Sequence, residues 1–83
     1  MVNTKAHITL LAQRKRVHFL LFELGVGHGH PISIPEVARR LGVHRSHFSK
    51  VVYGERHAVT ENGRWKSWSE FEADIRKAVE EAK

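Results

Sequence analysis

Two short stretches with helical character meet at a single glycine near the middle of this 83-residue chain. Ser33 offers a hydroxyl that caps the start of the first stretch, and Gly54 ends the second with the residue type that most easily takes a left-handed backbone. Between them, Gly42 supplies the positive φ with which a chain reverses in three or four residues. Each stretch must then bury its apolar face on the other and on further helices. The pattern predicts an all-α chain, a four- or five-helix bundle.

Caps, glycines and apolar periodicity set the bounds of the expected helices. We predict one domain over residues 1–83, with helices at residues 5–24, 34–41, 44–53 and about 68–82. In the first of these helices, Val17, Leu20 and Leu21 form the apolar side, and Gln13 is assigned to the opposite, polar side together with the basic residues that follow it.

Two local pairings are expected from spacing alone. Glu36 lies three residues after Ser33, so its carboxylate is placed to accept from the Ser33 backbone N–H and complete a capping box. Glu72 and Arg76 are one helical turn apart, which predicts a surface ion pair within the last helix.

The two central helices meet the demands of a helix-turn-helix, in which two helices cross steeply over a tight turn. The residue at their closest approach must be small, and Ala38 stands at that position. The apolar contacts between the helices come from five further residues: Val37, Leu41, Val43, Phe48 and Val51. We therefore predict a central helix-turn-helix at residues 34–53.

The segment PEVARRLGVHRSHFSKVVYGER, residues 35–56, resembles the DNA-binding unit of the Cro and lambda-type repressor family. The resemblance implies a sequence-specific regulator of transcription that binds double-stranded DNA, a small phage- or prophage-type repressor that acts as a homodimer. The chain departs from the family pattern at His44, where Ser or Thr is usual, and in a longer loop at residues 25–32.

Side chains on the outer face of the third helix are the candidates for DNA contact, because a helix-turn-helix inserts the start of this helix into the major groove. Arg45 is expected to bond the O6 and N7 atoms of a guanine. The residues expected to contact base edges are Arg45, Ser46, Ser49 and Lys50. The residues expected to contact phosphates are Arg40, His44, His47, Tyr53 and Arg56. The two histidines would contribute when protonated, which predicts mildly pH-sensitive binding.

The distribution of charge agrees with a polyanionic partner. The chain has a formal net charge of +5. Residues 1–57 hold nine Lys and Arg against three Glu, whereas residues 58–83 are slightly acidic. The basic excess therefore belongs to the part that carries the motif.

Other classes of protein fit less well. The chain has no cysteine, and its longest apolar run, Phe19 to Phe22, is far too short to cross a bilayer. With no signal-peptide pattern at the start, we expect a cytoplasmic, nucleoid-associated protein without membrane contact. The sequence shows no spacing of nucleophile and base that is typical of an active site. His28 and His30 lack the further ligands that a metal site requires. We expect no enzyme activity, no metal and no cofactor.

Three alternatives stay open. The chain could be a DNA-binding antitoxin whose acidic last helix meets a protein partner, a regulator of recombination or transposition, or a protein-interaction module. Trp65 and Trp68, three residues apart before that helix, are expected to pack on the core, with a dimer contact as the rival role.

Overall fold

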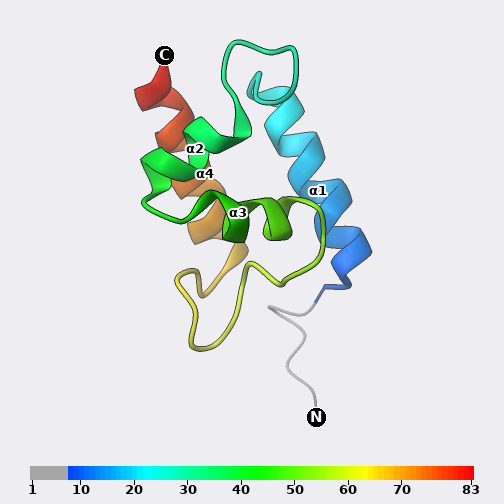
Figure 1. The fold of residues 1–83 in the computed structure, drawn as a ribbon. Helices are drawn as coiled ribbons and strands as arrows, with labels where there is room; N and C mark the ends of the chain where they lie inside the picture. The colour runs from blue at the N-terminus through cyan, green and yellow to red at the C-terminus, as the bar shows by residue number, and fades with distance from the viewer. Residues whose placement is uncertain (1–7) are drawn as a thin grey trace.

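The computed structural model describes residues 8–83, which form four α-helices. These are α1 (Leu10–Glu23), α2 (Ile34–Leu41), α3 (Arg45–Val52) and α4 (Trp68–Ala82), shown in Figure 1. Two isolated β-bridges, but no strand, occur within residues 8–83. The predicted all-α class is confirmed.

The first helix begins later than predicted. Residues 5–7 of the predicted helix lie outside the described part, and Ile8 and Thr9 are not helical. Thr9 is the N-cap, because its hydroxyl accepts from the backbone N–H of Ala12 at 3.0 Å. The helix ends at Glu23, and Leu24 is its C-cap.

Local caps set the bounds of α2 as the sequence predicts, but the predicted capping box does not form. The Ser33 hydroxyl accepts from the Glu36 N–H at 3.2 Å, and Gly42 follows the helix at φ 77°. The Glu36 carboxylate does not complete the predicted capping box. It accepts instead from Arg39 at 2.6 Å and from Arg40 at 2.8 Å, and these hydrogen bonds hold the pKa of Glu36 below its usual value.

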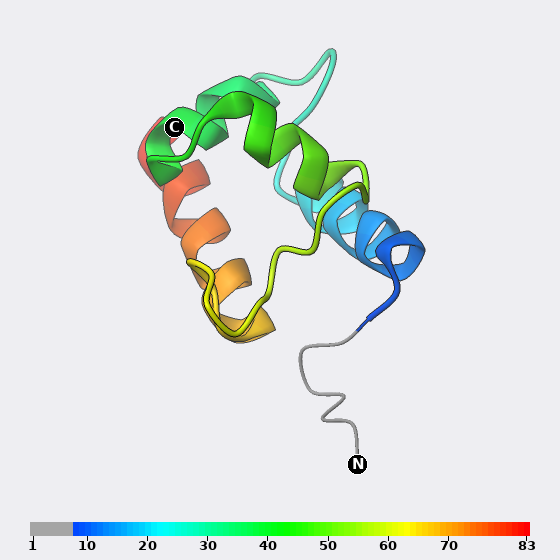
Figure 2. The same ribbon diagram turned by 60° about the horizontal axis from the view of Figure 1, so that its bottom comes forward.

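The α2–α3 pair links the two longer helices. α2 packs against both α3 and α4, and α3 packs against α1. Figures 1 and 2 show α4 at the α2 end of this pair and α1 at the α3 end, with the connection from α3 to α4 at the bottom of Figure 1. Val37, Ala38, Phe48 and Val51 are completely buried where α2 and α3 meet the rest of the core.

Both tryptophans belong to the core. The rings of Trp65 and Trp68 pack edge-on against Phe71 at centroid distances of 4.8 and 5.2 Å. The Trp65 indole N–H donates to Asp74 at 2.8 Å, which satisfies its polar atom inside the fold. The predicted packing role is confirmed for this pair.

The predicted pair between Glu72 and Arg76 is wrong. Glu72 accepts from Arg16 at 3.4 Å, and Arg76 lies 3.5 Å from Glu23. Both partners are on α1, so these ion pairs join α1 to α4 instead of lying within α4. All four side chains are at least one-third exposed, so each pair adds little stability.

Candidate nucleic-acid interface

His44 begins α3 by acting as its N-cap. Its Nδ1 accepts from the backbone N–H of Ser46 at 3.1 Å, the bond that a Ser or Thr hydroxyl makes in the same position elsewhere. His44 therefore fills the N-cap position with an imidazole acceptor where a hydroxyl or carboxylate is more usual. Because Nδ1 accepts this hydrogen bond, Nε2 lies on the side of the ring that faces away from the start of the helix.

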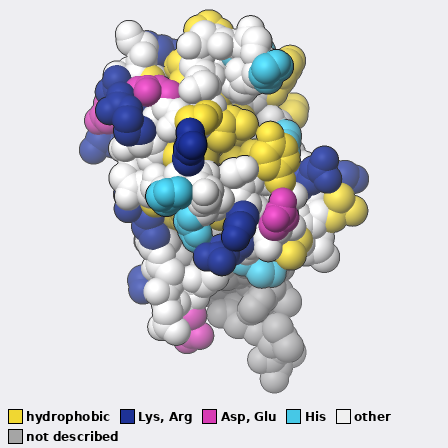
Figure 3. Space-filling view, in the orientation of Figure 1, with side chains coloured by type: hydrophobic (Ala, Val, Ile, Leu, Met, Phe, Trp, Pro, Cys, Tyr) yellow, Lys and Arg dark blue, Asp and Glu magenta, His cyan; other side chains and the backbone are white. Residues whose placement is uncertain are grey.

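α3 separates a buried face from a polar face. Phe48, Val51 and Val52 are completely buried, whereas Arg45 and Lys50 are exposed on the other side of the helix. Ser46 is exposed and Ser49 half-buried on that polar side, so the structure brings together all four residues expected to contact base edges. Figure 3 shows basic and histidine side chains over α3 beside a patch of apolar side chains.

The cations of this face have no acidic partners. Within residues 8–83, the ion pairs are formed by Arg16, Arg39, Arg40 and Arg76, and none involves Arg45, Lys50 or Arg56. Exposed cations that form no ion pair favour a positive potential on this face, which attracts an anionic ligand.

His47 and Arg56 form a contact at the C-terminal side of the polar face. Arg56 Nη1 donates to His47 Nδ1 at 3.2 Å, which requires that nitrogen to be unprotonated. Burial, together with the charges of Arg56 and Lys50, lowers the pKa of His47 below its ordinary value of 6.5. At neutral pH His47 is therefore an uncharged acceptor that positions the Arg56 guanidinium.

Tyr53 closes the same face toward α1. It is the C-cap residue of α3, is exposed, and has its ring 5.4 Å from the His18 ring of α1. The His18 Nδ1–H donates to the Arg14 carbonyl at 2.7 Å, which fixes the ring that Tyr53 packs against. The phenol is thus placed at the junction of α1 and α3.

Arg40 does not join the α3 residues. It lies on α2, donates to Glu36, and lines a small hollow with Asp74, Lys77 and Glu81 of α4. This position is on the α4 side of α2, and the Glu36 carboxylate already pairs with its guanidinium. Arg40 is therefore separate from the polar face of α3.

Sequence reasoning missed Gln13, whose side chain holds the end of α3 and the loop after it in position. The Gln13 side chain is 1% exposed, although the sequence assigned it to the polar side of α1. Its Nε2 donates to the carbonyls of Val51 at 2.9 Å and Arg56 at 2.8 Å, and its Oε1 accepts from the Ala58 N–H at 3.1 Å. One amide therefore anchors the end of α3 and the following loop to α1.

Gly54 allows the close approach that this anchor requires. It adopts φ 74°, and a Cβ at this position would lie 2.6 Å from the Leu10 carbonyl oxygen. Any side chain here would push α1 away from the end of α3. Gly54 thus has two roles, as a helix stop and as a contact point between helices.

No group of three or more His, Cys, Asp or Glu side chains within residues 8–83 is arranged to hold a metal ion. None of the described helices combines the length and apolar character that a membrane span requires.

Comparisons with known proteins add no assignment. The chain matches no family model, no curated protein and no solved structure. What the site does must be inferred from its own geometry.

Proposed function

We propose that this protein binds double-stranded DNA sequence-specifically and regulates transcription, acting as a small repressor. In this proposal α2 and α3 form a helix-turn-helix, and the polar face of α3 enters the major groove. The observation that carries it is the combination of exposed, unpaired cations with short hydroxyl side chains on one face of an eight-residue helix.

The chemistry of each side chain supports a division between reading and positioning. Arg45 lies in the first turn of α3, and in this proposal its planar guanidinium donates two hydrogen bonds to a guanine. Ser46 and Ser49 are short enough to let the helix approach the base edges closely. Lys50, one turn further on, contacts a guanine or an adjacent phosphate.

Phosphate contacts are assigned to the residues around the two ends of α3. Arg56 lies beyond the helix stop and is held by His47, so its guanidinium is positioned without belonging to the reading face. Tyr53 and His44 stand at the C-cap and N-cap positions, from which the phenol and the Nε2 edge extend outward. Such contacts fix the register of the protein on DNA and carry no sequence information.

We further propose that the protein acts as a homodimer on a two-fold operator, with α1 as the contact between protomers. Leu11, Phe19 and Phe22 are 60–70% exposed, and their spacing places them on the side of α1 opposite its buried residues. Exposed aromatic side chains gathered on one face are typical of protein interfaces. Because α1 packs on α3, a symmetric α1 contact would place two copies of α3 near each other.

The proposal is tested by measuring DNA binding at increasing salt concentration. Neutralising several phosphates releases counterions, so the affinity for duplex DNA should fall steeply between low and moderate salt. A fluorescence anisotropy titration with genomic fragments measures this slope. The matched control is Lys77→Ala, which removes one positive charge from α4 and should leave the slope unchanged, whereas Arg56→Ala should reduce it. No binding even at low salt would contradict the proposal and favour a protein-interaction module.

A further inference from the structure

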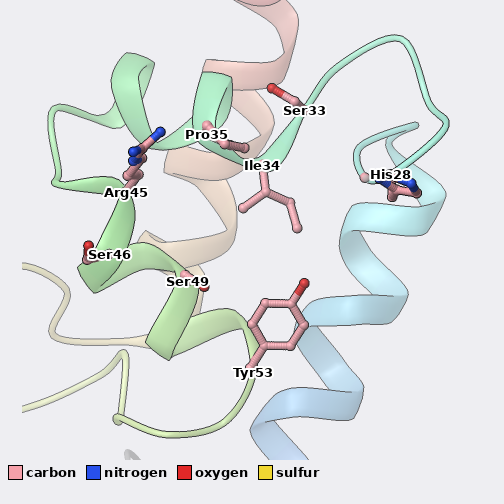
Figure 4. Close-up of a pocket in the computed structure, with 9 residues that line it drawn as sticks. His28, Ser33, Ile34, Pro35, Arg45, Ser46, Ser49 and Tyr53 are labelled. Carbon is pink, nitrogen blue, oxygen red and sulfur yellow. The ribbon is translucent and has the colours of Figure 1, made fainter.

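A hollow of about 500 Å³ lies beside the polar face of α3. Its walls come from three separate parts of the chain, namely α3, the start of α2, and the loop that precedes α2. The α3 wall consists of residues already assigned to DNA contact: Arg45, Ser46, Ser49 and Tyr53. The hollow is thus continuous with the proposed interface, and Figure 4 shows these side chains along one edge of it.

The opposite wall is apolar where α2 begins, and the loop before it adds Gly27, His28 and Ser33. Ile34 and Pro35 begin α2, and Figure 4 shows the Ile34 side chain pointing toward Ser49 and Tyr53. Ile34 is half-buried and Pro35 is exposed, so part of this apolar surface is open. No acidic residue lines the hollow, and Arg45 is its one Lys or Arg side chain. An occupant must therefore combine negative charge or hydrogen-bond acceptors with an apolar group.

The major-groove edge of DNA offers one apolar group, the C5 methyl of thymine. Acceptors on neighbouring bases face the same groove, so a guanine contacted by Arg45 and a thymine methyl can lie side by side. We propose that the thymine methyl group packs between α3 and the apolar surface formed by Ile34 and Pro35. The protein would then recognise a thymine next to the guanine bonded by Arg45. This inference rests on the proposed function and identifies α2 as a second contributor to sequence preference.

The test removes the methyl group without changing any hydrogen bond. A duplex selected by the protein from a random library is prepared with deoxyuridine in place of each thymine in turn. The parent protein should lose about fourfold in affinity at one position of each half-site, as expected for one buried methyl group, and little at the others. Ile34→Ala should abolish the difference between thymine and uracil at that position. The comparison is made within each variant, so a uniform loss of folded protein cancels.

A control at a second isoleucine separates contact with the methyl group from a general effect on folding. Ile8→Ala truncates another half-buried isoleucine that packs on the core, and it should keep the full preference for thymine. If the parent binds its selected duplex specifically but tolerates uracil everywhere, the inference is overturned while the proposed function stands. The inference is also overturned if Ile34→Ala keeps the preference, or if it weakens thymine, uracil and random duplexes equally, as packing on the sugar–phosphate backbone would do. If the parent selects no duplex at all, both proposals fail together.

Discussion

Gln13 shows how one side chain sets the position of residues far along the chain. Its amide satisfies three backbone groups, on Val51, Arg56 and Ala58, in a buried environment. Truncating it leaves the Arg56 carbonyl and the Ala58 N–H without these hydrogen bonds, whereas the Val51 carbonyl still accepts from the Gly54 N–H at 3.3 Å. Each unsatisfied buried group costs about 1–3 kcal/mol. We therefore predict that Gln13→Ala lowers the free energy of unfolding by more than about 2 kcal/mol. Urea denaturation measures this change, with Lys15→Ala on the exposed side of α1 as the control. Equal stability of the two variants would mean that Gln13 is not an anchor.

His47 makes the stability of the fold depend on pH. Its pKa in the folded chain is lowered, so between that value and the ordinary value of 6.5 the unfolded chain binds more protons. Stability should then be full above pH 6.5 and fall as the pH drops through the lowered pKa. Melting temperatures across this range, compared between the parent and His47→Gln, isolate the effect, and the variant should lose less stability. Parallel curves for the two proteins would contradict it.

DNA binding should respond to pH in the opposite direction. A phosphate stabilises the protonated imidazole, so binding takes up a proton and strengthens as the pH falls through the titration of His47. Anisotropy titrations at several pH values should show a smaller increase for His47→Gln than for the parent. An identical increase would assign the effect to another histidine.

At the scale of residues, sequence reasoning succeeded where the partner is local. The Ser33 cap depends on a residue three positions away, and the spacing alone identifies it. Gln13 stands one helical turn before Val17, so its spacing pointed to the buried side, but its polarity led to the opposite assignment. Its partners lie 38–45 residues further along the chain, and no local pattern reveals them.

Among the elements, substitutions at the two glycines that follow α2 and α3 show how closely other helices approach these positions. Both have φ near 75°, so an alanine is strained at either position, at a cost of about 1 kcal/mol or more. A Cβ at Gly42 would meet no atom within 4 Å, whereas one at Gly54 would collide with the Leu10 carbonyl. Gly54→Ala should therefore destabilise the protein clearly more than Gly42→Ala. Thermal melts of the two variants compare them directly, and equal losses would mean that α1 and α3 do not approach at Gly54.

The bounds of α2, α3 and α4 agree with the sequence prediction to within about one residue, because caps and glycines act locally. The start of α1 differs because the spacing of its apolar residues does not mark where the N-cap lies. The Glu72–Arg76 pair failed for another reason. Helical spacing allows the contact, but Arg16 and Glu23 approach from α1 and offer each partner an alternative. Intrahelical pairs are too weak to resist such competition.

For the whole molecule, the exposed apolar side of α1 makes the oligomeric state testable. Phe19→Ser combined with Phe22→Ser removes most of its exposed aromatic surface. We predict that the parent sediments as a dimer and this double variant as a monomer, since apolar burial drives such contacts. Ala73→Ser, on an exposed position of α4, is the control and should stay dimeric. A monomeric parent would contradict the proposed arrangement.

The central claim, that α3 reads DNA sequence, is tested most directly by comparing Arg45→Ala with Arg56→Ala. Binding-site selection is carried out with each variant, and affinities are measured for the selected duplex and for random DNA. Arg45→Ala should lose about 1–3 kcal/mol of specific binding and relax the preference at one base pair per half-site, while its affinity for random DNA changes little. Arg56→Ala should weaken both affinities together and keep the selected sequence unchanged. If Arg45→Ala selects the same sequence as the parent and Arg56→Ala selects a different one, α3 is not the reading element described here.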